Sequence, residues 1–264
     1  MCPRLFTIGS FSLPSYGVLV AIGFLVGLFL ASRLARRSGF NPDKITNLGV
    51  YVFLAAIFGA KAFMILHNLD YYVERPGQIL SLSSLQAGGV FYGGLLAALG
   101  TAVWFCRKHG LPPLATADTF APALAIGHSI GRLGCFAAGC CWGKPSTLPW
   151  AVEFTDPLAR EFVGVPLNIH LHPTQLYESF GTLAIGLFLL WYFGRPHRAG
   201  AIIGLYLLLY SAFRLGVEFL RAEAERTFPM GGPLSSTQWV AAGLVIAGIV
   251  LLLRRRGASA VESA

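Results

Sequence analysis

Six ionisable side chains lie inside or at the edge of long apolar stretches of this 264-residue sequence: Lys61, Asp118, Arg132, Glu178, Arg214 and Glu218. A charged side chain at bilayer depth costs about 2.5–3.5 kcal/mol, so each of them needs a partner, a cavity or a function. Arg214 and Glu218 are four residues apart and share one helix face, where they either neutralise each other or act together. In the same way, Lys61 and Asp118 could serve as counter-ions for each other.

Arg132 lies in the sequence GRLG (131–134), where small neighbours allow another molecule to approach. A guanidinium at the edge of a span lies at the level of the phospholipid headgroups, and its forked N–H groups match a phosphate. Snorkelling of the side chain to the interface would explain one such arginine, but it explains a pair less well. Arg132 and Arg214 together predict a site for an anionic lipid.

Residues 131–173 separate two apolar stretches and hold an unusual set of cysteines and histidines: Cys135, Cys140, Cys141, His170 and His172. Outside the cytoplasm, Cys135 could form a disulfide with Cys140 or Cys141. Thiolates combined with His128, His170 or His172 could instead bind zinc. Because no C-x-x-C pair is present, free thiols or a disulfide are the simpler interpretation, and we predict no metal site.

The composition of the chain indicates which kind of secondary structure positions these residues. The sequence is 55% hydrophobic and 12% charged, with a mean hydropathy of +0.64, whereas soluble domains carry about 25% charged residues. A water-soluble globular protein and a disordered chain are therefore excluded. Seven apolar stretches approach the length of about 20 residues that spans a bilayer: 12–32, 45–66, 88–106, 114–130, 174–193, 201–220 and 237–253.

This pattern predicts an all-α polytopic membrane protein, with seven transmembrane helices in a single integral domain over residues 1–264 and an outer loop, 131–173, between spans four and five. There are 20 Lys and Arg residues against 12 Asp and Glu, a formal net charge of +8. In a soluble protein this excess would suggest nucleic acid, but here it reports orientation. Alternate loops hold eleven cations on one side and six on the other, which predicts an outer N-terminus and a cytoplasmic C-terminus. No cleavable signal peptide is expected.

Several motifs follow one another along the chain: Tyr16-Gly17, GGVFYGGLLA from Gly88, DTFAP from Asp118, GRLGCFAAGCCWG from Gly131, HPTQLYE from His172, and YSAFRLGVE from Tyr210 followed by Arg221. The glycines around Tyr92 fit close helix packing or a backbone opened for a headgroup. Together and in this order, the motifs resemble those of the prolipoprotein diacylglyceryl transferase family. The resemblance covers nearly the whole chain.

The resemblance implies a bacterial inner-membrane enzyme with a periplasmic head, which moves diacylglyceryl from phosphatidylglycerol to the lipobox cysteine of a preprolipoprotein. The implied partners are phosphatidylglycerol, the preprolipoprotein signal peptide and membrane lipids, with no nucleic acid and no cofactor. We expect the donor to be bound by Arg132, Gly143, Tyr210 and His172. We expect catalysis to depend on Arg214, Glu218, Tyr16 and His128, with Glu218 orienting Arg214 on the donor phosphate.

Some signature positions depart from the family pattern. Tyr92 stands in place of a histidine, Cys135 and Ala138 in place of asparagines, and Cys140 in place of a glutamate. The phosphate-binding half of the site is thus retained, while the half that would handle protons is altered. Tyrosine is a poor base near neutral pH, so either His128 replaces it or the arginines lower the pKa of the acceptor thiol by proximity.

Two other functions remain open. The departures could mark a paralogue with a different donor or acceptor. A non-catalytic transporter or lipid-binding protein is the alternative from another class. Transporters typically contain paired repeats, however, and we find no such internal symmetry in this sequence.

Overall fold

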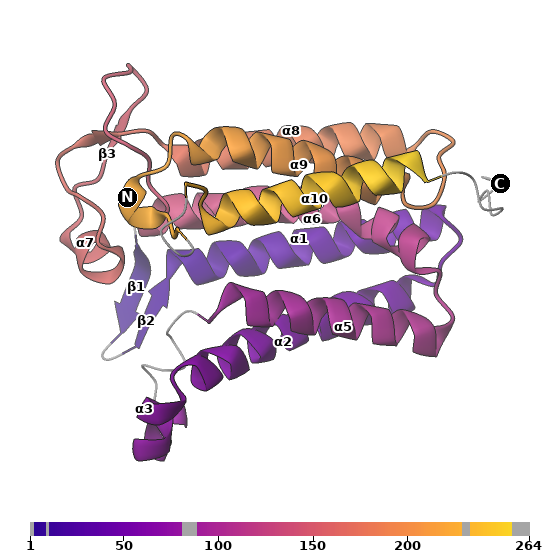
Figure 1. Cartoon of the computed structure of the whole chain (residues 1–264), viewed down its shortest axis with the longest axis horizontal. Helices are drawn as coiled ribbons and strands as arrows, with labels where there is room; N and C mark the ends of the chain where they lie inside the picture. The colour runs from indigo at the N-terminus through magenta and orange to yellow at the C-terminus, as the bar shows by residue number, and fades with distance from the viewer. Residues whose placement is uncertain (1–2, 9–10, 81–88, 229–232, 255–264) are drawn as a thin grey trace. The chain divides into compact units, whose positions relative to one another are not determined.

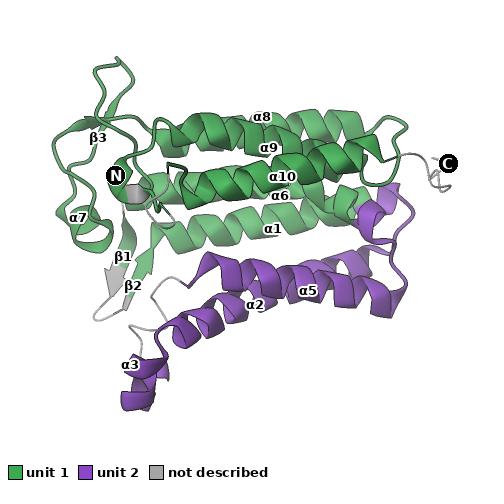
Figure 2. Cartoon of the chain, viewed as in Figure 1, with its two compact units in different colours: residues 1–34, 117–264 green, residues 35–116 purple. Residues whose placement is uncertain are grey.

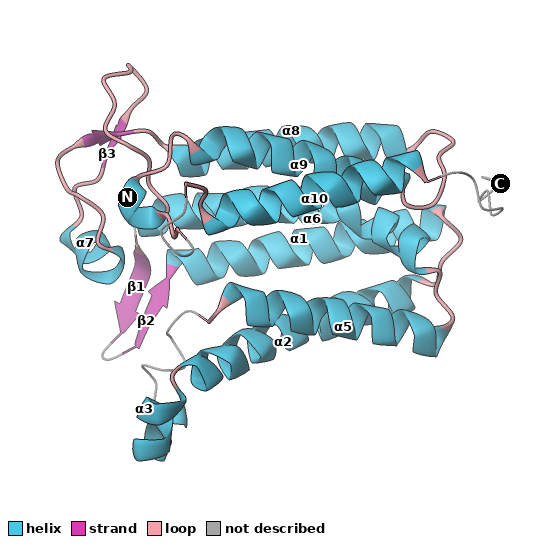
Figure 3. Ribbon diagram, in the orientation of Figure 1, coloured by secondary structure: helices cyan, strands magenta, loops and turns pink. Residues whose placement is uncertain are grey.

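The computed structural model describes residues 3–8, 11–80, 89–228 and 233–254. The chain forms two compact units (Figure 2), one made of Met1–Leu34 with Ala117–Ala264 and the other of Ala35–Thr116. Helices dominate both units, and strands occur only as short pairs among the described residues (Figure 3). The prediction of a single domain over residues 1–264 stays a prediction.

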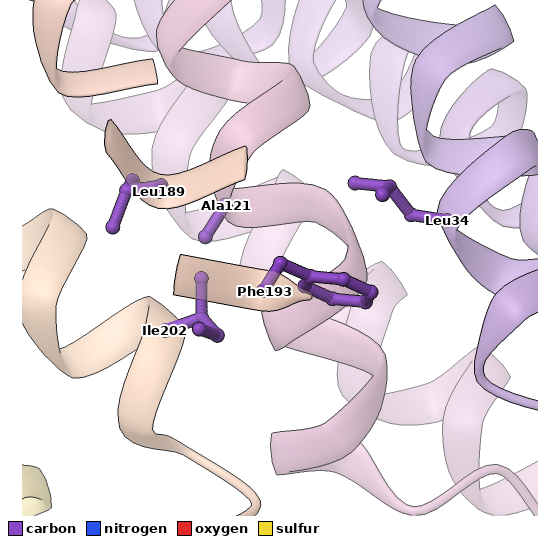
Figure 4. Close-up of a cluster of buried hydrophobic side chains, with 5 residues drawn as sticks. All are labelled: Leu34, Ala121, Leu189, Phe193 and Ile202. Atoms are coloured by element: carbon purple, nitrogen blue, oxygen red, sulfur yellow. The ribbon is translucent and has the colours of Figure 1, made fainter. Parts of the chain in front are cut away.

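The first unit is a bundle of long helices that lie side by side (Figure 1). Its helices are α1 (Ser15–Arg37), most of α6 (Pro113–Ala138), α8 (Thr174–Phe193), α9 (Ala201–Glu218) and α10 (Ser236–Leu253). Helix α9 packs against both α8 and α10. Leu34, Ala121, Leu189, Phe193 and Ile202 come from four of these helices and form a buried apolar cluster (Figure 4).

Asp118 joins two helices of this bundle. Its carboxylate oxygens accept hydrogen bonds from the backbone N–H of Gly200 at 2.7 Å and of Ile203 at 2.8 Å, at the N-terminus of α9. A carboxylate is stabilised there because the first N–H groups of a helix lack partners within the helix. Asp118 therefore has its partners at a helix terminus and does not need Lys61 as a counter-ion.

The segment between α6 and α8 is folded around its own small core. Strand β3 (Val152–Glu153) pairs antiparallel with β4 (His170–Leu171), and α7 (Pro157–Val163) lies between them in sequence. Trp142, Phe154, Ala159, Val165 and Leu171 form a buried cluster. Residues 139–173 therefore form a folded segment. A second strand pair, β1 (Arg4–Ile8) and β2 (Phe11–Pro14), precedes α1.

The second unit contains α2 (Pro42–His67), α3 (Leu69–Glu74), a 3-10 turn η1 (Pro76–Leu80) and α5 (Phe91–His109). Helices α2 and α5 pack closely because glycines meet at their contact. A Cβ placed on Gly93 would lie 2.6 Å from the carbonyl oxygen of Gly59, which is closer than a side chain allows. The motif around Tyr92 thus serves helix packing, as one of its two interpretations predicted; Gly88 lies outside the described residues.

All seven apolar stretches contain long helices, as predicted. By length and hydropathy, five of them can cross a membrane: α1, α2, α8, α9 and α10. Many large apolar side chains point outward, including Phe58, Leu96 and Phe180, each at least 66% exposed. An apolar exterior of this kind is expected where lipid replaces water. The protein is therefore a helical, multi-pass membrane protein.

One helix boundary differs from the sequence prediction. The fourth apolar stretch was expected to end at residue 130, but α6 continues to Ala138. The prediction took the charge of Arg132 as the end of the span. The helix continues because that charge is neutralised by a carboxylate of another helix, as described below.

Candidate active site

Glu178 of α8 lies between two arginines from different helices. Its Oε2 is 2.5 Å from an Nη2 of Arg132 on α6, and its Oε1 is 3.6 Å from Nε of Arg214 on α9. Glu178 is 2% exposed, so its charge is shielded from solvent and depends on these guanidinium groups. The two arginines expected to bind one phosphate are thus brought together by one carboxylate.

Glu218 forms the second half of this network. Its Oε2 is 2.8 Å from Nη1 of Arg214, one helical turn earlier, and its Oε1 is 3.4 Å from Nε of Arg226. The hydroxyl of Ser235 donates a hydrogen bond to Glu218 Oε1 at 2.6 Å. Ser235 is also the N-cap of α10, where it forms a capping box with Gln238. Glu218 therefore fixes Arg214 and ties α9 to the start of α10.

We call Arg132, Glu178, Arg214, Glu218 and Arg226 the arginine–glutamate cluster. It contains three guanidinium groups and two carboxylates, an excess of one positive charge, and the most exposed of these side chains, that of Arg132, is 13% exposed. Nη1 of Arg214 is buried and lies 2.8 Å from Oε2 of Glu218. Buried donors with surplus positive charge are suited to bind a monoanion such as a phosphodiester.

The cluster lies at one end of the bundle. Arg132 is in the last two turns of α6, Glu178 is near the start of α8, Arg214 and Glu218 are near the end of α9, and Ser235 precedes α10. Successive helices of this unit thus alternate in direction, and the 139–173 segment begins at the same end (Figure 1). The arrangement places the cluster beside the predicted outer loop.

His128 contacts this cluster through Arg132. The Nε of Arg132 donates a hydrogen bond to Nε2 of His128 at 3.2 Å, so both residues lie on one face of α6 as the four-residue spacing predicted. The lone pair of this imidazole nitrogen is occupied, and it cannot accept a proton there while the contact lasts. Tyr210 packs edge-on against the His128 ring with a centroid distance of 5.3 Å and stacks on Tyr206 at 5.7 Å.

Three cysteine sulfurs meet next to Arg132. The Sγ atoms of Cys135, Cys140 and Cys141 lie within 4.8 Å of one another, and Nη1 of Arg132 is 3.9 Å from Sγ of Cys135. We call these three residues the cysteine cluster. All three are free thiols, so the structure has none of the disulfides that were one expectation for these residues.

Backbone geometry brings these sulfurs together. Gly139 and Cys141 have φ values of 83° and 63°, and the positive φ of Cys141 is uncommon for a residue other than glycine. The side chains of Thr174 and Gln175 donate hydrogen bonds to the carbonyl oxygens of Cys141 and Cys140, each at 2.7 Å. The start of α8 therefore holds the cysteine-bearing turn in place.

The thiols also affect one another electrostatically. Hydrogen bonds from Cys135 and Cys140 lower the pKa of the Cys141 thiol, and the positive charges of Arg132 and Arg221 act in the same direction. Hydrogen bonding with Cys135 and Cys141, together with burial, raises the pKa of Cys140. The Cys141 thiol is therefore more acidic than the Cys140 thiol.

Gly143 is placed where three segments of the first unit join. Its N–H donates to the carbonyl oxygen of His172 at 3.1 Å, and its backbone bridges to Arg221. A Cβ at this position would lie 2.6 Å from the carbonyl oxygen of His172 and 2.9 Å from that of Leu220. Because the Gly143 N–H is occupied, it is not available to a phosphate.

The side chain of His172 contacts a tyrosine, since its ring nitrogen Nδ1 is 3.3 Å from the Tyr177 hydroxyl.

Comparisons with known proteins show the family of this chain. The model of the prolipoprotein diacylglyceryl transferase family matches residues 3–254. The chain belongs to the prolipoprotein diacylglyceryl transferase family. A protein of Clostridium tetani named phosphatidylglycerol–prolipoprotein diacylglyceryl transferase is 33% identical over 250 residues, which cover 94% of this chain and 96% of the relative.

Relatives from distant bacteria carry the same name. One from Finegoldia magna is 33% identical and is aligned over 94% of both chains. One from Synechococcus elongatus is 32% identical over 95% of this chain and 86% of the relative. The chain therefore matches members of the prolipoprotein diacylglyceryl transferase family over almost its whole length.

Tyr16, which matches the family pattern, and Tyr92, which departs from it, lie in different units. Tyr16 is the second residue of α1, and its backbone carbonyl lies 3.2 Å from the position of a Cβ on Gly134, so it is next to α6, the helix that carries Cys135. Tyr92 belongs to the second unit, on the first turn of α5, and is 44% exposed.

Sequence reasoning missed several members of the site. Glu178 was noted as an intramembrane charge in the motif HPTQLYE but was not assigned to the site, although it joins both arginines. A charge within a span is a functional candidate by default, and that signal was present. Arg226 and Ser235 follow the last recognised motif, and no sequence pattern connects them with Glu218.

Proposed function

We propose that this chain transfers a diacylglyceryl group from phosphatidylglycerol to the cysteine thiol of a prolipoprotein. The names of its relatives supply the reaction, and the arginine–glutamate cluster supplies a site that suits the donor. The observation that carries the proposal is the pair of arginines held on one buried carboxylate, with one positive charge in excess. Phosphatidylglycerol carries one negative charge on its phosphodiester, which this excess matches.

The reaction is a displacement at carbon. The acceptor sulfur, as thiolate, attacks the glyceryl carbon bonded to phosphate oxygen; the C–S bond forms, the C–O bond breaks, and its electron pair leaves with glycerol phosphate. Negative charge grows on the leaving phosphate. Donors that are already oriented toward that charge lower the barrier, because no solvent has to reorganise as the bond breaks.

Arg132 and Arg214 are the residues we assign to the phosphate. A guanidinium has five N–H donors, so Arg214 can contact Glu178 and Glu218 and still donate to a phosphate oxygen. Glu178 contacts both guanidinium groups, and Glu218 contacts that of Arg214 as well. This preorganisation is the role we propose for both carboxylates, and it makes Glu178 a positioning residue in addition to Glu218.

The other expected site residues receive roles that follow from their contacts. His128 accepts a hydrogen bond from Arg132 and is packed by Tyr210, so we assign both to positioning Arg132. Gly143 and His172 connect the outer segment to the end of α9 and shape the site without contacting the donor through the Gly143 N–H. Tyr16 lies beside α6 at the same end of the bundle and lines the approach to the cysteine cluster.

We further propose the membrane arrangement that the sequence predicted. All seven long helices cross the bacterial inner membrane, with the N-terminus and residues 139–173 on the periplasmic side and the C-terminus in the cytoplasm. The alternating directions of α6, α8, α9 and α10 and the cation distribution support this. The acceptor is then a membrane-anchored signal peptide whose cysteine reaches the outer end of the bundle.

Complementation tests the function directly. The chain is expressed in cells depleted of their own transferase, and a lipoprotein is analysed by mass spectrometry for a thioether-linked diacylglyceryl group. The proposal predicts the modified lipoprotein and restored growth, both lost with Arg214→Ala. A stable, membrane-inserted chain that yields no modified lipoprotein contradicts the proposal and favours the paralogue with another donor or acceptor.

A further inference from the structure

The cysteine cluster has a composition and geometry that neither the reaction nor the arginines require. Three sulfurs that share one zinc ion at about 2.3 Å lie about 3.8 Å apart in a tetrahedral arrangement. The sulfurs of Cys135, Cys140 and Cys141 already lie within 4.8 Å of one another. Each separation is thus at most about 1 Å longer than a shared zinc ion requires.

The backbone around the cluster is fixed independently of any ligand. Cys135 is on the last turn of α6, and the backbone N–H groups of Gly139 and Cys140 both donate to its carbonyl oxygen, at 3.0 and 3.1 Å. Cys141 is held in a left-handed conformation, and non-glycine residues in that region store strain of about 1–3 kcal/mol, typically where function requires it. Two side chains of α8 anchor the same turn through its carbonyl groups.

The surrounding charge suits a thiolate-bound cation. Three thiolates and one Zn²⁺ carry a net charge of −1, and the Arg132 guanidinium lies 3.9 Å from the Cys135 sulfur. Soft thiolate ligands select zinc and similar ions over magnesium and calcium. Cys135 is 9% exposed and the other two cysteines are partly exposed, so one side of the cluster remains accessible.

We propose that Cys135, Cys140 and Cys141 bind one Zn²⁺ ion whose fourth position accepts the thiol of the incoming acceptor. Sites with three protein ligands and an open fourth position are the catalytic type of zinc site. Coordination deprotonates a thiol outright; its proton passes to water, the zinc-bound sulfur forms the C–S bond, and the C–O electron pair leaves with glycerol phosphate. The role of the zinc ion in binding the acceptor thiol rests on the function proposed above.

Metal content tests the site without any activity measurement. The full-length chain is purified in detergent with reductant after expression with added zinc, and zinc is measured by mass spectrometry. We expect one zinc ion per chain, with occupancy reduced at least about tenfold in Cys140→Ser. Cys106→Ser is the matched control, because Cys106 is a buried cysteine on α5 outside the cluster, and it should keep full occupancy.

Cobalt offers a second readout that does not depend on stability. Co²⁺ bound by thiolates gives a charge-transfer absorption band, which we expect in the wild-type chain and in Cys106→Ser but not in a Cys135, Cys140 and Cys141 triple serine variant. Absence of zinc from the reduced wild-type chain, or equal zinc in the triple variant, overturns the site. A Cys140–Cys141 or Cys135–Cys140 disulfide found in the chain as purified without reductant, with no zinc, also overturns it.

Removal and return of the metal tests its role in transfer. A chelator should lower the transfer rate at least about tenfold, and Zn²⁺ but not Mg²⁺ should restore it. A chain that transfers lipid equally well without zinc overturns this inference and leaves the proposed function intact. A chain that binds zinc through these cysteines yet transfers no lipid contradicts the proposed function and leaves the metal site intact.

Discussion

At the scale of single residues, the arrangement of Glu178 is the main observation of the site. A buried carboxylate between two guanidinium groups is stable only while both charges are present, because removing one partner of a buried ion pair costs about 3–5 kcal/mol. The same arrangement holds Arg132 and Arg214 on the two oxygens of one carboxylate. Stability and phosphate binding are therefore coupled at this site, and experiments must separate them.

Replacing Arg132 is the first way to separate them. Arg132→Ala should lower the transfer rate on the order of a hundredfold or more, because a preorganised donor to the leaving phosphate is lost. Arg132→Lys should recover only part of that loss, since an ammonium keeps the charge without the forked geometry. The measurement is the initial rate of transfer from phosphatidylglycerol vesicles to an acceptor peptide.

A double variant provides the control for folding. Arg132→Ala with Glu178→Gln removes both members of the ion pair, so the carboxylate is no longer left buried with too little positive charge. The melting temperature in detergent should rise relative to Arg132→Ala alone, while transfer stays low. Recovery of transfer in the double variant would mean that Arg132 acts only through stability.

His128 provides a second prediction at the residue scale. Since its Nε2 already accepts a hydrogen bond from Arg132, we expect His128→Ala to lower transfer by less than about tenfold, whereas loss of a general base costs about 10²–10⁴-fold. Rates are compared over a range of pH. A loss of a hundredfold or more, together with a lost dependence on pH near neutrality, would identify His128 as the base.

At the scale of elements, two contacts position the site from outside it. Gly143 joins the cysteine-bearing turn to His172, the residue after β4, and to the residues after α9. Asp118 joins the starts of α6 and α9, at the ends of these helices that lie away from the site. The first contact holds the site itself, whereas the second is 14 residues from Arg132 along α6, about 21 Å at 1.5 Å per residue.

The Gly143 contact should tolerate no side chain. Gly143→Ala would place a Cβ against the carbonyl oxygens of His172 and Leu220, and backbone atoms cannot move aside as a side chain does. We expect a loss of about 1–3 kcal/mol in stability and a reduced transfer rate, measured by thermal unfolding and by vesicle assay. Gly243→Ala on α10 is the control, since nothing lies within 4 Å of its added Cβ; equal stability losses in both variants would contradict the assignment.

The Asp118 contact should affect stability but not chemistry. Asp118→Ala leaves the N–H groups of Gly200 and Ile203 without their acceptor and should cost about 2 kcal/mol. Asp118→Asn keeps one acceptor oxygen and should lose less. The transfer rate per folded molecule, with the folded fraction taken from thermal unfolding, should be unchanged, and a large fall in that rate would place Asp118 in the catalytic machinery.

At the scale of the whole molecule, the orientation across the membrane decides whether the site faces its acceptor. A fluorescent protein fused after residue 264 should fold and fluoresce in the cytoplasm, and alkaline phosphatase inserted after Trp150 should be active in the periplasm. These outcomes follow from the larger number of cations in the loops assigned to the cytoplasm. An active phosphatase at the C-terminus would reverse the proposed orientation and put the site on the wrong side of the membrane for its acceptor.

Features that depend on nearby residues could be predicted from the sequence. Apolar runs of bilayer length indicated the seven long helices, since hydropathy acts over a single segment. The four-residue spacings placed Arg214 beside Glu218 and His128 beside Arg132, because helix geometry alone brings such residues together. The ordered motifs also identified the family.

Features that join distant segments were decided only by the tertiary structure. Glu178, 46 positions after Arg132 and 36 before Arg214, meets both because three helices pack at one end of the bundle. The end of α6 at Ala138, the acceptor role of Asp118 at α9 and the convergence of three cysteine sulfurs have the same origin. A buried charge or thiol must find its partner in space, and sequence spacing cannot specify that partner when it comes from another helix.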